Sequence, residues 1–475
     1  MLRARPGPVR RPRRTTDGDG ETAVVIGAGI SGLLAARVLA DVFDRVLVLE
    51  RDALPDGPEF RPGVPQARHA HVLLARGQSI CEELFPGLSA ELEAAGAPPF
   101  DTGYTDILFP HGPAEPSPCG ISVLMASRPL LETHIRRRVT ALNGVVIQDA
   151  TRVTGLSFDD CGARVRGVRA AGRGPGHTWK DDAAVAAALV VDASGRASKL
   201  AQWLRAAGRQ DTQETVVDPR VGYASRIYDV PEQRRGDPAF SGELLYAPRL
   251  TRGYGALRIE GDRLLVTLQG AGGDRPPRDE EGFTAFARSL RSPLQSVLDD
   301  LSPASAIYQF TRTSNRKVAY HTMRDWPGGL VAIGDSVCTF NPLYAHGMSV
   351  AAMEALVLRQ LVADGRDLSS ARCRQFQRRV ARTIAWPWLL ATQSDRGWQE
   401  DHQPGHTERA AHWFLDQWIR AIPGDPMMYH RFLRVAHLLA GPASLLCPST
   451  LAAMFRSRSR SEGLSVHDSA ESKAP

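Results

Sequence analysis

Residues 23–36 read AVVIGAGISGLLAA, and an apolar run, RVLVLE, follows and ends at Glu50. The first segment passes from β-branched residues through Gly27 to helix-forming residues. In such a βαβ unit Gly27 permits a tight turn, Gly29 lets backbone N–H groups approach a pyrophosphate, and Gly32 allows close helix–strand packing. A carboxylate at Glu50 can accept hydrogen bonds from ribose hydroxyls. The stretch predicts a dinucleotide site; a glycine-rich turn in an unrelated α/β protein is the alternative.

A second glycine-containing stretch lies far along the chain, where residues 330–349 read LVAIGDSVCTFNPLYAHGMS. Its apolar start predicts a strand, and the residues from Gly347 to about Ala363 predict a helix. Asp335 at the strand end can hold a ribityl hydroxyl. The helix N-terminus at Gly347 and Met348 offers unpaired N–H groups and partial positive charge, which suits the anionic edge of a reduced flavin. Together the two stretches indicate FAD, bound along its length by both halves of the chain.

The spacing of Asp335, Pro342 and Gly347 resembles that of the para-hydroxybenzoate hydroxylase-like flavin monooxygenases. The resemblance implies an α/β fold with a Rossmann-like FAD-binding domain, an inserted mixed β-sheet substrate domain and a helical C-terminal region. The expected boundaries are a disordered leader at 1–20, FAD-binding segments at 22–80, 120–220 and 315–365, a substrate-binding sheet at 81–119 and 221–314, helices at 366–455, and a disordered tail at 456–475.

Further segments narrow the resemblance. They are ERDALP (50–55), GVPQARHAH (63–71), SRPLL (127–131), DASGR (192–196) and NPLYAHGM (341–348). Spread over about residues 22–400, they look like those of the actinomycete polyether epoxidases of the monensin and lasalocid type. The resemblance implies an enzyme of specialised metabolism, such as antibiotic biosynthesis, that epoxidises an alkene of a polyketide or terpenoid intermediate. Its oxidant would be a C4a-hydroperoxyflavin formed from reduced FAD and O2.

The two stretches and the matching family positions together imply a set of cofactor contacts. They are Gly27, Gly29, Gly32, Glu50, Arg51, Arg68, Arg128, Val153, Asp192, Gly195, Asp335, Pro342, Gly347 and Met348. Arg128 would reach the pyrophosphate, although a surface arginine at a helix start fits the pattern too. Related enzymes carry an Asp-Gly pair that serves FAD and NAD(P)H, whereas here Gly195 comes three residues after Asp192. NAD(P)H is the expected reductant, bound directly or acting through a separate flavin or NAD(P)H reductase.

Few acid or base side chains are expected, because the flavin would supply the oxidant. His346 precedes the flavin-facing helix and is the single catalytic candidate, with a structural turn histidine as the alternative. Gln66, Arg68, His69 and His71 are expected on a loop near the cofactor. The six cysteines are scattered without a CxxC pair, which indicates reduced thiols and no metal site.

Three predicted strands between residues 222 and 269 suit the floor of a substrate cavity. On them Tyr223, Tyr254 and Leu257 are expected to line an apolar wall that carries a few hydroxyl groups. Period-two alternation would turn Arg226 to the opposite face. An apolar small molecule is therefore the expected substrate, with O2 as the second reactant.

Other enzymes share this FAD fold and stay open as alternatives. An aromatic or polyketide hydroxylase would oxygenate a related scaffold, a spirotetronate-type cyclase would use FAD without redox turnover, and a geranylgeranyl-type reductase would need no O2. Halogenation is not expected, because the segment Trp386-Pro-Trp388 lacks the Trp-x-Trp-x-Ile-Pro signature of flavin halogenases and their essential lysine has no match.

The net charge of +6 comes from the leader, which carries six arginines before residue 15. The rest of the chain is formally neutral, which argues against a nucleic-acid-binding protein. Residues 438–455 are uncharged and fairly apolar, but Gly441-Pro442 and Pro448 interrupt them, so packed helices are expected rather than a stable membrane span. Scattered cysteines and the lack of an apolar export segment favour a cytoplasmic protein.

Overall fold

The computed structural model describes residues 21–172, 182–363, 365, 367–399 and 401–454. Within this part, five parallel strands form one sheet in the order β20-β11-β1-β2-β7. They are β1 (Thr22–Ile26), β2 (Arg45–Leu49), β7 (Val145–Gln148), β11 (Leu189–Asp192) and β20 (Leu330–Ala332). Most of their side chains are buried on both faces, as in a parallel sheet covered by helices.

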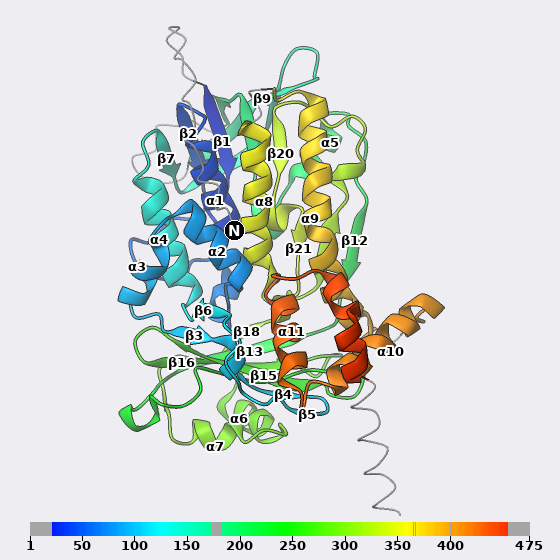
Figure 1. The fold of residues 1–475 in the computed structure, drawn as a ribbon. Coiled ribbons are helices and arrows are strands. Elements are labelled where there is room, and N and C mark those ends of the chain that lie inside the picture. Colours follow the sequence, from blue (N-terminus) through cyan, green and yellow to red (C-terminus); the bar gives the residue numbers. More distant parts are fainter. Residues whose placement is uncertain (1–20, 173–181, 364, 366, 400, 455–475) are drawn as a thin grey trace, which may run out of the picture.

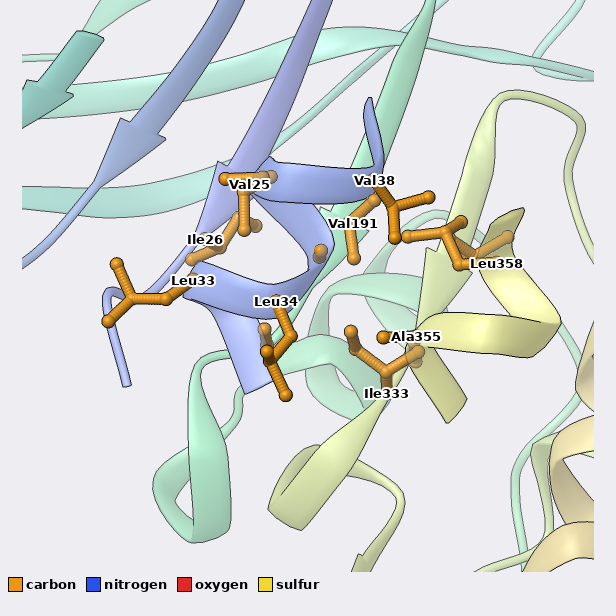
Figure 2. Close-up of a cluster of buried hydrophobic side chains, with 14 of the residues drawn as sticks. Val25, Ile26, Leu33, Leu34, Val38, Val191, Ile333, Ala355 and Leu358 are labelled. Atoms are coloured by element: carbon orange, nitrogen blue, oxygen red, sulfur yellow. The ribbon is translucent and has the colours of Figure 1, made fainter. Parts of the chain in front are cut away.

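Helices pack both glycine-containing stretches into one hydrophobic core. They are α1 (Ile30–Leu39), α2 (Ala75–Leu84), α3 (Leu88–Ala94), α4 (Arg128–Thr140) and α8 (His346–Ala363). Figure 2 shows Leu34 and Val38 of α1 packed with Val191 of β11 and Leu358 of α8. Each such side chain contributes about 1.5–3 kcal/mol by leaving water. The two halves of the chain are therefore held in one fixed arrangement.

A mixed sheet, which we call the large sheet, forms the second layer (Figure 1). In the described residues its strands run in the order β17-β13-β16-β15-β14-β4-β5, and β18 also pairs with β13. Their bounds are β4 (Asp106–Phe109), β5 (Gly112–Pro113), β13 (Gly222–Asp229), β14 (Phe240–Glu243), β15 (Arg252–Ile259), β16 (Arg263–Gly270), β17 (Ser302–Pro303) and β18 (Tyr308–Phe310). Helices α6 (Glu280–Arg288) and α7 (Leu294–Leu298) cover its outer face, at the bottom of Figure 1.

Smaller sheets and a short helix accompany the two layers. Their elements are β3 (Pro99–Asp101) paired with β6 (Ser122–Leu124), then β8 (Thr151–Phe158), β9 (Val165–Gly172) and β10 (Ala183–Ala186), then α5 (Leu200–Ala206), and finally β12 (Glu214–Val217), β19 (Asn315–Val318) and β21 (Cys338–Thr339). The last sheet carries the chain from the large sheet back to α8.

The C-terminal part is helical, as expected. Helix α9 (Ser370–Arg396) packs along α8, and α10 (His406–Arg420) and α11 (Pro426–Ala436) lie beside the large sheet (Figure 1). Met428 and Tyr429 of α11 share a buried cluster with Phe109 of β4. Among the described residues, no helix combines the length and the apolarity that crossing a bilayer requires.

The predicted fold class is confirmed: the chain is an α/β protein with a parallel sheet, a mixed sheet and a helical C-terminal region. The expected boundary at residue 81 falls inside α2, and α2 and α3 bury Ile80, Leu84 and Leu88 in the core of the parallel sheet. We therefore propose that the first segment of the FAD-binding domain extends to about residue 97. The expected leader and tail lie outside the described residues.

Candidate active site

A cleft of about 370 Å³ opens where the parallel strands end. The residues that follow β1, β2, β11 and β20 all line it, and so do the first turn of α8 and the loop at residues 61–72. The carboxyl edge of a parallel sheet is the usual ligand site in α/β proteins. Both glycine-containing stretches contribute to this one cleft.

The first stretch uses its three glycines in different ways. Gly27 has a φ of +99° and lies so close to Ala193 that an added Cβ would come within 2.6 Å of its carbonyl oxygen. Gly29 caps α1 and lines the cleft, and a Cβ there would meet no atom within 4 Å. Gly32 does not line the cleft; its Cβ would overlap the carbonyl oxygen of Gly27. Only Gly27 and Gly29 can therefore face a ligand, whereas Gly32 allows α1 to approach the turn.

Glu50 lies directly after β2 and lines the cleft. Its Oε2 accepts the backbone N–H of Ala28 at 2.7 Å, and Oε1 accepts that of Asp52 at 3.0 Å. These bonds hold the carboxylate beside the turn that carries Gly29. Arg51, which follows Glu50, and Val153 of β8 also line the cleft.

Arg61 is a cleft residue that the sequence analysis missed. It is 8% exposed and pairs with Glu50 at 3.3 Å and with Glu132 at 2.9 Å. Burial acts to lower its pKa, but the carboxylates of Glu132 and Glu50 outweigh it and raise the pKa. Arg128 lines the cleft too and pairs with the same Glu132 at 3.1 Å. A third carboxylate partner of Arg61 is Asp52, at 3.1 Å. No local pattern marks Arg61, because Glu132 is distant in the sequence and the other two carboxylates belong to the segment after β2.

The second stretch lines the same cleft. Asp335, Pro342, Gly347 and Met348 all line it. Burial raises the pKa of Asp335, while the charges of Arg128 and Arg196 act to lower it. The first turn of α8 faces the cleft, so its unpaired N–H groups and partial positive charge are directed there.

Asp192 is a cofactor candidate that does not reach the cleft. Its buried carboxylate accepts the Ser194 backbone N–H at 3.0 Å and the Ser198 hydroxyl at 2.6 Å. It therefore shapes the turn rather than facing a ligand. Gly195 in that turn lines the cleft, and so does Arg196, whose guanidinium donates to the carbonyl of Ser314.

The loop at residues 61–72 brings Gln66 and His71 to the cleft, but not Arg68 or His69. Arg68 lies between the rings of Phe60 and Tyr308, 4.4 and 4.2 Å from their centroids. The expectation that Arg68 faces the cofactor is therefore wrong, because the two rings hold its guanidinium outside the cleft.

His69 and His71 are both held by polar contacts. His69 Nδ1 lies 2.7 Å from the hydroxyl of Ser225 on the inner face of the large sheet. His71 Nδ1 lies 2.9 Å from the carbonyl of His69 and must donate to it, which leaves Nε2 as an acceptor when the ring is neutral. Burial, and then the charge of Arg128, lowers the pKa of His71 to about 4. The cleft therefore contains a neutral imidazole.

The catalytic candidate His346 is not part of the cleft. Its ring is 3% exposed, stacks on Tyr344 and meets Phe340 edge-on. Burial lowers its pKa to about 4. The expected catalytic role is thus contradicted by its position, because the helix that presents Gly347 and Met348 to the cleft turns the preceding side chain into the protein.

The three expected substrate residues divide between two faces of the large sheet. Tyr254 belongs to the cluster under α6 and α7, and the expectation that it lines a substrate wall is wrong. Leu257 lies on the inner face with Phe100 and Val123, which cover it. Tyr223 is on the inner face as well, where its hydroxyl donates to Asn341 at 2.9 Å. An odd spacing puts residues 254 and 257 on opposite faces of a strand.

The cleft is strongly cationic. Among the described residues that line it, the cations are Arg51, Arg61, Arg128, Arg152, Arg196, Lys199 and Arg312, and the acids are Glu50 and Asp335. Arg152, Lys199 and Arg312 were not anticipated, because they come from separate segments and meet only in the folded chain. In the part of the chain that the structure describes, no group of His, Cys, Asp and Glu could hold a metal ion.

Comparisons with known proteins agree with this fold. No protein-family model matches the chain. Protein Rv3254 of Mycobacterium tuberculosis is 31% identical over 431 residues, which cover 88% of this chain and 89% of that protein. The flavin-dependent brominase Bmp2 has a TM-score of 0.64 at 16% identity over 94% of this chain and 99% of its own.

Two further solved structures are similar. A flavoprotein/dehydrogenase from Cytophaga hutchinsonii has a TM-score of 0.65 at 13% identity, over 93% of this chain and 99% of its own. PqsL of Pseudomonas aeruginosa, solved in complex with 2-aminobenzoylacetate, has a TM-score of 0.56 at 16% identity, over 79% of this chain and 97% of its own. At such identities the likeness establishes a shared fold.

Proposed function

This chain belongs to the same family as Protein Rv3254 of Mycobacterium tuberculosis, and we propose that it is an FAD-dependent monooxygenase. Its proposed reaction is the epoxidation of an alkene in an apolar polyketide or terpenoid intermediate. One observation carries the proposal. A single cleft is lined both by the glycine turn and Glu50 and by Asp335 and the first turn of α8.

The donor set of the cleft fits FAD. Gly29 and the start of α1 would receive the pyrophosphate, with Arg128 beside it, since helix N-termini and arginine both stabilise phosphate. Glu50 would accept the ribose hydroxyls, Asp335 would accept a ribityl hydroxyl, and Gly347 and Met348 would face the flavin. The solved neighbours Bmp2, a flavin-dependent brominase, and PqsL, a probable FAD-dependent monooxygenase, support flavin chemistry as the use of this fold.

When bound, FAD would supply the oxidising power through O2. The task of the chain is then to hold the substrate, exclude water and avoid unwanted proton transfer. Phe310, Phe340, Val72 and Ala351 give one part of the cleft an apolar lining. His71 is neutral, so it can accept a hydrogen bond from a ligand without adding charge.

The cations favour direct use of NAD(P)H. Arg196, Lys199 and Arg312 line the same cleft as the residues proposed for FAD, and Trp203 lies among them. Such a set suits the phosphates and an aromatic ring of a second nucleotide. We expect Arg312→Ala to raise the KM for NADPH about tenfold without changing the FAD content. If NADPH reduces the bound FAD of Arg312→Ala as fast as that of the wild type in the absence of O2, these cations do not bind NADPH. Delivery of electrons by a separate reductase would then be supported.

The reaction class is tested by incubating the purified protein with FAD, NADPH and polyene probes such as squalene or geranylgeraniol. Epoxidation predicts a gain of one oxygen that depends on both O2 and NADPH. A product of unchanged mass would indicate a cyclase, and a gain of two hydrogens without O2 would indicate a reductase. Incorporation of added bromide or chloride would indicate a halogenase. NMR of the product distinguishes an epoxide from an alcohol.

A further inference from the structure

A buried polar network lies under the turn that precedes α8. At its centre is Asp395 of α9, a wholly buried carboxylate. Its Oδ2 accepts the Asn315 side chain at 2.5 Å and the Asn341 side chain at 3.0 Å, and its Oδ1 accepts the Tyr344 hydroxyl at 2.7 Å. The cleft residue Asn341 is thus bonded directly to a side chain that does not line the cleft.

Each of these partners of Asp395 is a donor. Both asparagines use their Nδ2 groups, and Tyr344 uses its hydroxyl. An ionised carboxylate can accept from all three groups at once, whereas a protonated carboxyl or an amide would either point a donor at an asparagine N–H or require the Tyr344 hydroxyl to accept instead of donate. Among the described residues, no cation forms an ion pair with Asp395, so hydrogen bonds alone stabilise its charge.

Asp395 also decides which way the Asn341 amide faces. Because Nδ2 of Asn341 donates to Asp395, Oδ1 is left to accept the Tyr223 hydroxyl at 2.9 Å and the Leu343 backbone N–H at 3.2 Å. The backbone N–H of Asn341 in turn donates to Asn315 Oδ1 at 2.8 Å. The network therefore connects α9, β19 and β13 to the turn at residues 341–345.

We propose that Asp395 is a positioning residue: as a carboxylate it orients Asn341 and the turn before α8, so that its protonation loosens this turn and weakens FAD binding. The inference rests on the proposed function for its FAD-binding consequence, but the ordering of the turn does not require FAD. Asp395 itself would touch neither cofactor nor substrate.

Burial raises the pKa of Asp395 to about 6, and the bonds from Tyr344, Asn341 and Asn315 act against this increase. The charge of Asp218 adds to the increase. Tyr344 and Tyr223, the other titratable groups facing the network, have pKa values raised further by burial and stay neutral.

The direction of the pH effect separates positioning from simple stability. A carboxyl with a raised folded pKa makes the folded state relatively more stable below about pH 6, not less. Within the folded state, the bonds from Tyr344, Asn341 and Asn315 lower the pKa of Asp395, so a loosened turn that leaves the carboxyl buried without them has the higher pKa and is favoured by protonation. Loss of turn order and FAD affinity on acidification would then occur without loss of global stability from this group. A residue with only a structural role would not produce that combination.

The first measurement is hydrogen–deuterium exchange of the full chain without FAD, corrected for intrinsic exchange rates, between pH 5 and 8. In the wild type we expect residues 341–348 to lose about tenfold protection below pH 6. Asp395→Asn should exchange fast at every pH, with its unfolding midpoint still measurable. Glu243→Gln is the matched control, because Glu243 is also a buried carboxylate but pairs with Arg291 between α6 and α7, away from this network. It should behave as the wild type at residues 341–348.

The second measurement is FAD affinity by flavin fluorescence quenching. The wild-type Kd should increase about tenfold on acidification, and that of Asp395→Asn should be high and independent of pH.

Protection of residues 341–348 in Asp395→Asn, or a wild type whose protection there does not change with pH, would overturn the inference. A wild type that shows the exchange pattern but never binds FAD would overturn the proposed function instead.

Discussion

Glu354 of α8 accepts the backbone N–H of Gly334 at 2.6 Å from a fully buried position. Burial raises the pKa of Glu354 to about 8; the Gly334 bond acts to lower it and the charge of Asp335 to raise it. The side chain is therefore protonated at neutral pH. It supports, from inside the core, the turn that carries Asp335 to the cleft.

We expect Glu354→Gln to change the pH dependence of stability. Because the folded pKa lies above the ordinary 4.5, the stabilising effect of the protonated group is complete below about pH 4.5 and is lost as the pH rises toward 8. Glutamine keeps the shape and cannot ionise. Denaturant unfolding should give similar midpoints near pH 5 and a higher midpoint for the variant above pH 8. Parallel curves at all pH values would contradict this assignment.

Gly29→Ala and Gly32→Ala should separate ligand binding from folding. A methyl group at residue 29 meets no protein atom within 4 Å but would project toward the proposed pyrophosphate site, so folding is retained and FAD affinity falls at least tenfold. At residue 32 it would overlap the Gly27 carbonyl oxygen, which costs about 3 kcal/mol or more. Thermal unfolding and flavin fluorescence measure the two effects. Equal loss of stability in both variants would refute the distinction.

His71→Ala and His346→Ala should affect turnover differently. His71 lines the cleft and His346 does not, so only His71→Ala is expected to lower kcat or FAD affinity. His346→Ala should cost about 2–3 kcal/mol of stability, because a buried ring is removed. Full loss of kcat in a folded, FAD-containing His346→Ala protein would show that His346 has a catalytic role after all.

The pH dependence of turnover should show no transition from the titration of His71 or His346. The pKa values of both histidines are lowered to about 4, so each ring is neutral between pH 5.5 and 8. We expect any decrease in FAD-dependent turnover near pH 6 to disappear in Asp395→Asn and to persist in His71→Gln. Loss of that decrease in the histidine variant alone would assign the titration to His71.

Tyr223→Phe and Tyr254→Phe compare the two faces of the large sheet. Tyr223→Phe removes the bond to Asn341 and should raise the Kd for FAD or the KM of the substrate several-fold. Tyr254 lies under α6 and α7, so Tyr254→Phe should leave both constants unchanged. Steady-state kinetics and a Kd measurement on both variants give the comparison, and an altered KM in the second variant would contradict the placement.

The sequence by itself determined the fold class and the two strand–turn–helix units that carry the glycine turns. The patterns that did so are local: an apolar run, a glycine turn and a helix within residues 23–36, and again within 330–363. In each case the local backbone conformation favours particular residue types, so a few consecutive residues are enough to predict the strand, the turn and the helix. The roles of Gly27, Glu50 and Asp335 as cofactor contacts stay predictions, although all three line the cleft.

Only the tertiary structure decided which charged and polar side chains share the site. Arg61, Lys199 and Arg312 meet at one cleft from three separate segments, and Asp395 reaches Asn341 across 54 positions of sequence. The same holds for the candidates that failed: Arg68 is held by two aromatic rings, and His346 and Tyr254 face the protein interior. The direction of a side chain depends on contacts between segments that are distant in the sequence. A pattern of a few consecutive residues does not predict these contacts.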